Sequence, residues 1–457
     1  MGRKTTKKAG DFRYNTGAAK VPWAAVGENY NAEDTLEFVK FLMQPKVGGK
    51  AGRPGIGSYR VALKKVEAAL KELARVSEAP SKLSMGDKVA EVEKLCDKYL
   101  GVEEGSSLFV TNCTAALELG YRYAGIGPGD EVIVPTNTFI ATVAYPLSVG
   151  AKLVFADVDP VTVNIDPKDI ERKITKKTKI IVPVHIGGYP CDMDAIMKIA
   201  KKHDIVVMED AAHGFGGEYK GRKLGTIGHF GCFSMHEVKN CTSLGEGGLF
   251  VSNVPEYRAE ARRARFLGVD FSTKIKNWLY NISLIHGKGN TVYQASNNAS
   301  VTEIQAVGLI RQLKRYPKIL AERKCEATYM TKRLSKIDGV KPQLLGDKDH
   351  KPTFHLYQLQ IDPKIVGGDV QRLKEKLSEK GVTNIPHFGP IYRFAASIGK
   401  GFNEKKIAAT CPVTEYVFDK CYTHLPIYGL TPEQLKYMAD AIIESVAEMK
   451  KASAGKR

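Results

Sequence analysis

The sequence of 457 residues has no apolar run long enough to span a membrane and no recognisable secretion signal. Its eight cysteines are scattered, with no C-x-x-C pair and no His/Cys cluster at zinc spacing. The glycine-rich stretch from Pro45 to Tyr59 lacks the G-x-x-x-x-G-K-[ST] pattern of a P-loop. We therefore expect a cytoplasmic protein in a reducing compartment, with no metal site and no membrane partner.

Acidic residues are scarce relative to basic ones. The chain has 68 Lys and Arg against 50 Asp and Glu, a net charge of +18, and its first 80 residues hold 15 basic against 8 acidic side chains. A basic balance is compatible with nucleic acid, an anionic surface or phosphorylated ligands. Because no block of basic residues with interleaved aromatics occurs, we interpret the charge as a solvated surface and expect no nucleic-acid partner.

From Asp87 onward, apolar runs of strand length alternate with helical patterns. This alternation predicts an α/β fold with a largely parallel sheet that is covered by helices on both faces. The expected strands are Leu108–Thr111, Glu131–Pro135, Leu153–Ala156, Ile180–His185, Ile205–Met208, Phe230–Met235 and Leu249–Ser252. The helices expected between them include Ala115–Tyr123, Phe139–Val149 and Met193–Lys202.

The length allows more than one domain. We expect a basic N-terminal extension at residues 1–84, a large domain at 85–320 and a smaller α+β C-terminal domain at 321–457. In the extension, residues 1–30 are predicted to form an arm. Two helices are expected in the extension, at Asn31–Met43, capped by Asn31, and at Tyr59–Val76. Thr302–Leu334 is expected to form a long helix or a broken pair of helices, with Pro317 as the break. The C-terminal part is expected to contain a strand at Phe354–Ile361, helices at Val370–Lys380 and Pro432–Lys450, and a disordered tail.

The strongest chemical signal lies between Met208 and Gly248. One predicted strand, Ile205–Met208, ends in Glu209-Asp210, and Lys239 comes just after another, Phe230–Met235. Pyridoxal phosphate (PLP) chemistry needs such a pair: a lysine that holds the aldehyde as a Schiff base, and an acid that keeps the pyridine nitrogen protonated so that the ring can take up electrons. Burial makes a lysine lose its proton more easily, which frees the amine to act as nucleophile and base.

The letters around this pair resemble the DegT-like (DegT/DnrJ/StrS) family of sugar aminotransferases, within the aspartate-aminotransferase fold type. That family carries D-A-A-(Gln or His), then F-S-F-x-x-x-K-N, then G-E-G-G. The chain has Asp210-Ala211-Ala212-His213, then Phe233–Asn240 with the lysine and asparagine in place, then Gly245–Gly248. The resemblance covers about residues 85–450. It implies PLP fold type I, with a seven-stranded sheet in the large domain.

The resemblance also implies roles for single residues. Lys239 would bind PLP and move the proton, Asp210 would hold the ring nitrogen protonated, and His213 would lie near the phenolic oxygen. Ser234 matches the serine that hydrogen-bonds the phosphate. His185, in the family's P-V-H segment, is assigned to structure or to the approach of substrate.

A further part of the expected cofactor site follows the first strand. Thr111–Leu117 corresponds to the family's N-G-T-x-A-L segment, so Thr114 resembles its phosphate ligand, and the free amides of a helix start suit an anion. Cys113, which we also expect to bind the cofactor, stands where the family has glycine, so the backbone there must avoid a glycine-only conformation. Pro135–Thr142 matches P-x-x-T-F-x-A-T, which implies that Phe139 stacks on the pyridine ring.

The segment Ser296–Ala306, at the start of the expected long helix, indicates how subunits assemble. Ser296–Ala306 aligns with the family's G-x-N-x-R-M-x-x-x-Q-A. The resemblance implies that Asn298 reaches the phosphate of a neighbouring subunit, and hence a homodimer with shared active sites. Ser300 replaces the family's arginine, which leaves details of substrate and interface open. Pro386–Tyr392 and Cys421–Pro426 resemble the family's two C-terminal motifs.

We predict a PLP-dependent aminotransferase that moves an amino group from an amino acid, glutamate or glutamine, to a free or nucleotide-linked keto-sugar with ping-pong kinetics. The first alternative is a dehydratase or a cyclitol/aminohydroxybenzoate-forming enzyme of the same family, since His213 and Cys411–Thr414, followed by Cys421, resemble the aminohydroxybenzoate synthases. The family's dehydratases carry histidine instead of the lysine, so Lys239 argues against that branch. The second alternative is a non-catalytic regulatory or nucleic-acid-binding relative, which only the charge supports.

Overall fold

The computed structural model describes residues 31–44, 56–77, 83–274, 280–383, 389–395 and 402–455. The chain divides into two compact units, Met1–Leu83 and Ser84–Arg457. The three-part division at residues 84 and 320 that we expect from the sequence stays a prediction. Among the described residues, no helix is both long and apolar enough to cross a membrane, and no group of His, Cys, Asp and Glu side chains could hold a metal ion.

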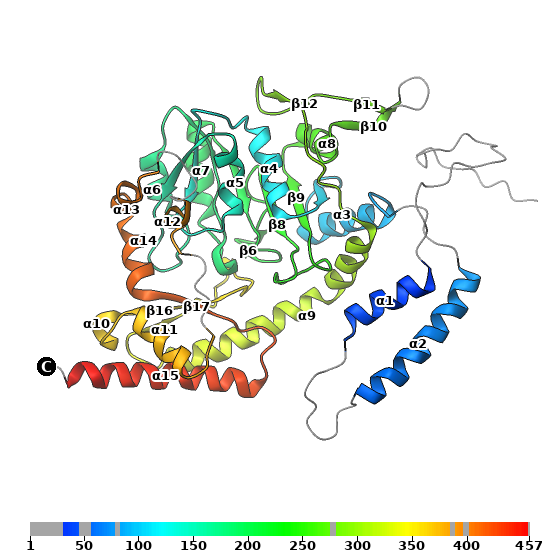
Figure 1. Cartoon of the computed structure of the whole chain (residues 1–457). Coiled ribbons are helices and arrows are strands. Elements are labelled where there is room, and N and C mark those ends of the chain that lie inside the picture. Colours follow the sequence, from blue (N-terminus) through cyan, green and yellow to red (C-terminus); the bar gives the residue numbers. More distant parts are fainter. Residues whose placement is uncertain are drawn as a thin grey trace, which may run out of the picture. The chain divides into compact units, whose positions relative to one another are not determined.

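The first unit contains two helices, α1 (Ala32–Leu42) and α2 (Ile56–Val76) (Figure 1). Asn31 caps α1 as predicted: its side chain accepts hydrogen bonds from the amides of Glu33 and Asp34 at 2.7 and 3.1 Å. Helix α2 begins three residues before the predicted start. The predicted arm at residues 1–30 and most of the glycine-rich stretch lie outside the described residues.

A seven-stranded sheet forms the centre of the second unit, in the spatial order β1-β9-β8-β5-β4-β2-β3. Neighbouring strands are parallel except for the two pairs that involve β9. This confirms the predicted α/β fold with a largely parallel sheet. The strands are β1 (Ser107–Val110), β2 (Glu131–Pro135), β3 (Lys152–Ala156), β4 (Thr178–Ile181), β5 (Val206–Asp210), β8 (Phe230–Ser234) and β9 (Gly248–Ser252).

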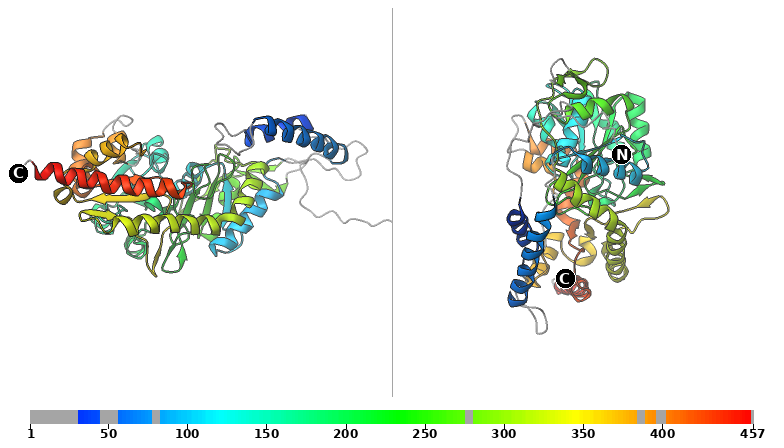
Figure 2. Two further views of the ribbon diagram at one scale, coloured as in Figure 1. Left: turned by 90° about the horizontal axis from the view of Figure 1, so that it is seen from below. Right: turned by 90° about the vertical axis from the view of Figure 1, so that its right-hand side faces the viewer.

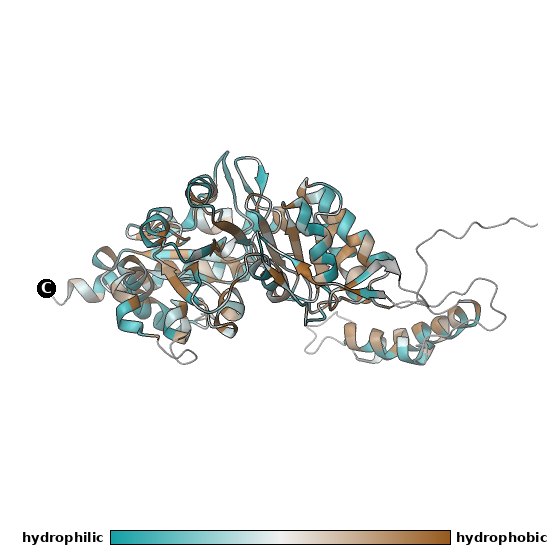
Figure 3. Cartoon of the chain, turned by 90° about the horizontal axis from the view of Figure 1, so that it is seen from above, coloured by the Kyte–Doolittle hydropathy of each residue, from teal (hydrophilic) through white to brown (hydrophobic). Residues whose placement is uncertain are grey.

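Alternate residues of these strands pack on opposite faces of the sheet, as the two-residue period of a strand requires. Met208 of β5 lies in the core that contains α4 (Cys113–Tyr123), whereas Val207 lies in the core that contains α7 (Met193–His203). Helices thus cover both faces, and hydrophobic residues concentrate in the strands between them (Figures 1 and 3). Other helices here are α3 (Asp87–Leu100), α5 (Ala141–Ser148), α6 (Pro167–Lys173) and α8 (Pro255–Ala264).

The C-terminal part builds a second core around an antiparallel sheet of three strands, ordered β14-β16-β17. Its long helices lie side by side (Figure 2). The strand predicted from Phe354 begins three residues later, because Phe354 has a positive φ of 53° that no regular strand adopts. The elements are β14 (Val340–Pro342), β16 (Tyr357–Ile361), β17 (Tyr422–Leu425), α9 (Glu303–Leu334), α10 (Pro363–Val366), α11 (Val370–Glu379) and α15 (Pro432–Ala454).

For this region one of two predicted alternatives is confirmed and one prediction is wrong. Helix α9 is continuous through Pro317, so the long helix forms and the broken pair does not. Proline removes only its own backbone donor, and the neighbouring turn is held by buried Tyr316, whose hydroxyl donates to the carbonyl of Phe215. The predicted disordered tail is helical to Ala454, because α15 buries residues as late as Met449.

Shorter elements complete the described residues. Two small hairpins follow α8 and lie at the top of Figure 1. The short strands are β6 (Glu218–Tyr219), β7 (Arg222–Lys223), β10 (Val269–Lys274), β11 (Tyr280–Ile282), β12 (Ile285–His286), β13 (Val292–Tyr293) and β15 (His350–Lys351). The short helices are α12 (Ile391–Ala395), α13 (Glu404–Ala409) and α14 (Pro412–Tyr416), which a π-helical turn at Val417–Cys421 follows.

Candidate active site

The carboxyl ends of β5, β8 and β1 lie at the same edge of the sheet, and the predicted site residues follow them. Asp210 ends β5 and is opposite Cys232 of the parallel strand β8. Ser234 ends β8 and is opposite Gly248, which in turn is opposite Val110 at the end of β1. Ligands of open α/β sheets bind in crevices at such ends. The register therefore places the acid, the serine and the start of α4 at one edge.

Gly248 allows the strand β9 to approach the start of α4 closely. A Cβ atom on Gly248 would lie 2.2 Å from the carbonyl carbon of Asn112 and 2.6 Å from the amide nitrogen of Cys113, so no other residue fits. Cys113 is the first residue of α4 and is not among the described non-glycine residues with positive φ. Cysteine therefore replaces the family's glycine without backbone strain.

The start of α4 offers a binding place for an anion. Asn112 caps the helix by accepting a hydrogen bond from the amide of Ala115 at 2.9 Å, and the exposed Thr114 follows in the first turn. Unpaired amides and the helix dipole attract negative charge there. Buried Ser234 ends the strand on the other side of β9, at the same edge. This arrangement suits a phosphate group.

Asp210 is a buried acid whose carboxylate accepts two hydrogen bonds from the described residues. Its carboxylate accepts hydrogen bonds from the Thr142 hydroxyl at 2.7 Å and from the amide of Ala212 at 3.1 Å. Burial raises the pKa of Asp210, while these donors and the positive charge of Lys239 act against the rise. A cation placed against this carboxylate would be strongly favoured, because it would compensate the cost of burying the negative charge.

Lys239 lies in the turn after β8, where its amide donates to the carbonyl of His236 at 2.9 Å. Burial lowers the pKa of Lys239, and the nearby carboxylate of Asp210 acts against that change. A lowered pKa makes the neutral, nucleophilic amine more abundant at neutral pH than for an exposed lysine. The structure thus brings Lys239, Asp210 and Cys113 within electrostatic reach of one another.

His213 is buried and stacks on His355, with ring centroids 4.2 Å apart and an interplanar angle of 26°. The Nδ1 atom of His355 lies 2.9 Å from Oδ1 of Asn240, whose amide nitrogen donates to the carbonyl of Thr353. Because the Asn240 oxygen can only accept, Nδ1 of His355 carries the proton. This chain of contacts joins His213 to the residue directly after Lys239.

His355 is not among the site residues predicted from the sequence, although it lies in a segment that was expected to be a strand. Thr142 is the last residue of the matched segment Pro135–Thr142, but the sequence does not predict its hydrogen bond to Asp210. Asn240 directly follows Lys239 in the family motif, and this was the one sequence feature that pointed to the partner of His355. All three residues belong to the site by geometry.

Two predicted residues lie exposed. The side chain of Phe139, after β2, is 58% exposed. Asn298 is also exposed, and its Oδ1 accepts a hydrogen bond from the amide of Ser300 at 3.0 Å. Stacking of Phe139 on a cofactor and the reach of Asn298 into a second subunit therefore stay predictions.

His185 has a structural role. Its Nδ1 accepts a hydrogen bond from the amide of Cys191 at 3.1 Å, so its Nε2 carries the proton and donates to Glu209 at 3.0 Å. The Glu209 carboxylate, also fully buried, accepts three further bonds from the amides of Gly225, Ile227 and Gly228. This cluster fixes the loop before β8 against β5, at the residue that precedes Asp210.

We predict that Glu209→Ala lowers the free energy of unfolding by about 3–5 kcal/mol, because it leaves buried donors without an acceptor. Urea denaturation of the purified chain measures this. The matched control is Glu171→Ala, which removes an exposed ion pair with Lys202 and is expected to change stability far less. Equal losses in the two variants would show that the Glu209 cluster does not stabilise the fold.

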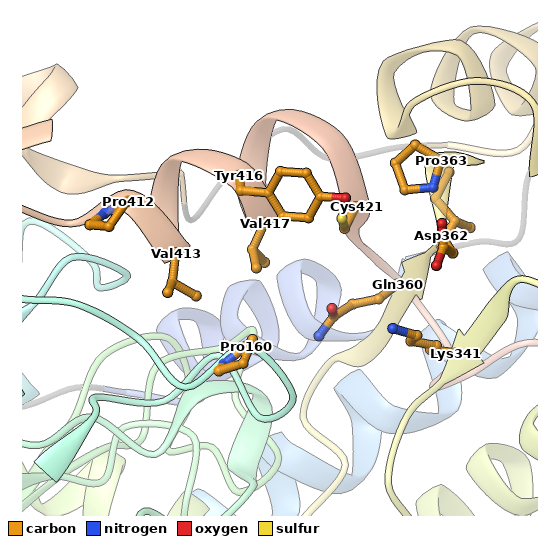
Figure 4. Close-up of a pocket in the computed structure, with 11 residues that line it drawn as sticks. Pro160, Lys341, Gln360, Asp362, Pro363, Pro412, Val413, Tyr416, Val417 and Cys421 are labelled. Carbon is orange, nitrogen blue, oxygen red and sulfur yellow. The ribbon is translucent and has the colours of Figure 1, made fainter. Parts of the chain in front are cut away.

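A cavity of about 340 Å³ lies between the Pro160 loop, the strands β14 and β16, and α14 (Figure 4). Lys341, Asp362 and Tyr416 are among the residues that line it. None of the predicted site residues does, so this cavity is separate from the cluster around Lys239.

The chain was compared with known proteins. The sequence pattern of the DegT/DnrJ/EryC1/StrS aminotransferase family matches residues 64–443. A UDP-4-amino-4-deoxy-L-arabinose–oxoglutarate aminotransferase from Shewanella sediminis is 35% identical over 67% of this chain and 76% of its own length.

Solved structures are similar in fold across most of the chain. A putative sugar aminotransferase from Streptococcus pneumoniae, in its PMP form, matches with a TM-score of 0.70 and 26% identity over 82% of this chain and 94% of its own. A 3-amino-5-hydroxybenzoic acid synthase matches with a TM-score of 0.69 and 27% identity over 89% of this chain and 100% of its own.

Proposed function

The chain belongs to the DegT/DnrJ/EryC1/StrS aminotransferase family, and on that premise we propose that Lys239 and Asp210 form its reaction centre. The protein is a PLP-dependent aminotransferase that transfers an amino group to a keto-sugar. The observation that carries the proposed centre is the buried pair itself. A lysine of lowered pKa lies within electrostatic reach of a buried acid, at the carboxyl ends of adjacent strands.

The residues present fit PLP. The phosphate would be held at the start of α4 by the first amides and Thr114, with Ser234 from the end of β8. The exposed ring of Phe139 offers a flat face to the pyridine, and Asp210 offers a buried carboxylate to a protonated ring nitrogen. When bound, PLP supplies an electron-poor ring that takes up the electrons released as a substrate carbon loses its proton.

The chain's own groups have distinct tasks in this proposal. The neutral Nζ of Lys239 is the nucleophile that binds the cofactor aldehyde, and later the base that takes the proton from the substrate carbon and returns it. Asp210 keeps the pyridine nitrogen charged, and Thr142 orients the carboxylate through its 2.7 Å hydrogen bond. His213, fixed by stacking on His355, would lie near the phenolic oxygen of the cofactor.

The finer assignments are also proposals. Glutamate or glutamine is the donor, and the acceptor is a nucleotide-linked 4-keto-sugar, because the Shewanella relative is named for a UDP-linked 4-amino sugar. Two copies assemble with shared sites, to which the exposed Asn298 contributes. The protein works in the cytoplasm, in keeping with its eight free cysteines, all of which lie in described residues.

The alternative on the same fold is formation of an aminohydroxybenzoate. The fold similarity does not separate it from sugar amination, since the two solved structures match equally well. The family relative from Shewanella favours amino transfer. Lys239 remains the argument against a dehydratase.

The test is an incubation of the purified enzyme with PLP, L-glutamate and a UDP-linked 4-keto-sugar, followed by mass spectrometry. We expect the amino sugar and 2-oxoglutarate in equal amounts. Loss of water from the sugar without consumption of glutamate would contradict the proposal and favour the dehydratase. Omitting the keto-sugar is the control, since net 2-oxoglutarate should then stop at one equivalent per active site.

A further inference from the structure

Outside the active site, a lysine and a cysteine lie in direct contact. The Nζ atom of Lys173, the last residue of α6, is 3.4 Å from Sγ of Cys411, the residue that precedes α14. The Cys411 side chain is fully buried, and that of Lys173 is only 13% exposed. The two residues are 238 positions apart in the sequence, so the contact joins the large domain to the C-terminal segment.

The contact is held by surrounding polar groups. The ammonium of Lys173 donates to the carbonyl oxygens of Phe155 at 2.7 Å and Thr410 at 3.0 Å, and it pairs with Asp169 at 2.9 Å. The thiol of Cys411 lies 3.6 Å from the same Phe155 carbonyl. Nitrogen and sulfur are thus fixed side by side on one acceptor, which removes most of the entropy cost of bringing them together.

We propose that Lys173 and Cys411 form an oxidative modification site, at which dioxygen joins their side chains through one oxygen atom as an N–O–S bridge. The ammonium of Lys173 first releases one proton to solvent, and the step then consumes the resulting neutral amine, the thiol and one O₂. One oxygen atom becomes the bridge. The other oxygen atom leaves as water, which takes one hydrogen from the nitrogen and the hydrogen of the thiol. Nitrogen and sulfur each lose two electrons, and O₂ accepts all four.

Geometry and access favour this product over other oxidation products. Burial raises the pKa of the Cys411 thiol, with Lys173 acting against the rise, so attack on a bulky disulfide is suppressed. Dioxygen is small and apolar, and it enters packed interiors that larger oxidants do not. Oxidation of a sulfur beside a nitrogen can also end in a sulfenamide, which loses the oxygen as water, so retention of one oxygen atom identifies the bridge. Here that nitrogen is already in contact.

The bridge would fasten a segment that reaches the active-site loop. Thr414, three residues after Cys411, donates to Asp157 at 2.6 Å and lies 2.7 Å from the hydroxyl of Thr136. Thr136 stands at the end of β2, three residues before Phe139. A reversible bond at Lys173 and Cys411 therefore ties the C-terminal segment to the loop that carries Phe139 and stabilises the folded chain against heat, because the closed loop restricts the unfolded state.

The experiment uses the full-length chain carrying Cys325→Ser, which removes the one exposed cysteine and its intermolecular oxidation. The protein is kept either under oxygen or anaerobically with a thiol reductant, and intact mass, peptide mass and unfolding temperature are measured. We expect under oxygen a species heavier by one oxygen atom and lighter by two hydrogen atoms. Its digest contains one cross-linked peptide with Lys173 and Cys411, and its unfolding temperature is higher. Reductant reverses all three changes.

Two variants in the same background isolate the partners. Cys411→Ser and Lys173→Arg each remove one reacting atom, so neither should give the cross-linked species. Persistence of that mass in either variant would overturn the proposal. The peptide map of the parent chain tests the proposal even if a variant fails to fold. Oxygen retained on Cys411 alone, or no oxygen-dependent change in mass, would equally overturn the proposal.

Discussion

Replacing Lys239 with alanine should reduce amino transfer by at least about 10⁴-fold, since one amine serves as both nucleophile and proton carrier. No other lysine is expected to substitute. Among the lysines that the structure describes, Lys239 alone follows β8, has a pKa lowered by burial and lies within electrostatic reach of Asp210. Steady-state rates with L-glutamate and keto-sugar measure the loss. Peptide mapping after borohydride reduction should find the cofactor on Lys239 in the parent enzyme only.

Lys201→Ala is the matched control, since it removes an exposed lysine in the last turn of α7. Its rate should equal that of the parent enzyme. If Lys239→Ala retained turnover close to that of Lys201→Ala, Lys239 would not be the reacting amine and the proposed centre would be wrong.

The second large effect is expected for Asp210→Asn, with a loss on the order of 10²–10³-fold in kcat. Asparagine keeps the shape of the side chain but cannot hold a proton on the pyridine nitrogen through a negative charge. Because burial raises the pKa of Asp210, the fold tolerates a neutral group there, and the cofactor-free variant should unfold at no lower temperature than the parent. Kinetics and thermal unfolding together separate a chemical role from a structural one.

Thr142→Val provides the comparison for Asp210→Asn. It removes only the hydroxyl that donates to Asp210 at 2.7 Å and leaves the charge in place, so we expect a loss of about 10-fold. A kcat for Asp210→Asn that matched the Thr142→Val value would argue that the carboxylate charge contributes nothing beyond its hydrogen bond.

Much of the central sheet could be predicted, because its buried strands are short apolar stretches of sequence. The helices between them show the regular spacing of apolar residues that is typical of a helix. Glu131–Pro135 matches β2, and Asp210 falls at the end of β5 as the run of apolar residues before it indicates. The association of Lys239 with Asp210 also followed from sequence, since both lie in one block of letters and both follow strands that share an edge of the sheet.

Other features depend on contacts between distant residues and left no local pattern. His355 meets Asn240 across 115 positions, and neither a period nor a spacing encodes that contact. Likewise the amides that bind Glu209 come from a loop that reads as polar and irregular. Helix α9 continues through Pro317, although proline alone indicates a break. Burial of the flanking turns outweighs the loss of one backbone hydrogen bond.

We propose that this chain uses PLP on Lys239 to accept an amino group. The most direct test is the absorption spectrum of the enzyme, purified with PLP, before and after addition of L-glutamate in the absence of a keto-sugar. We predict a cofactor band that bleaches on addition of glutamate and returns with 2-oxoglutarate. Lys239→Ala should show neither the band of the parent enzyme nor the response. A band that ignores amino acids, or a parent spectrum equal to that of Lys239→Ala, would contradict it.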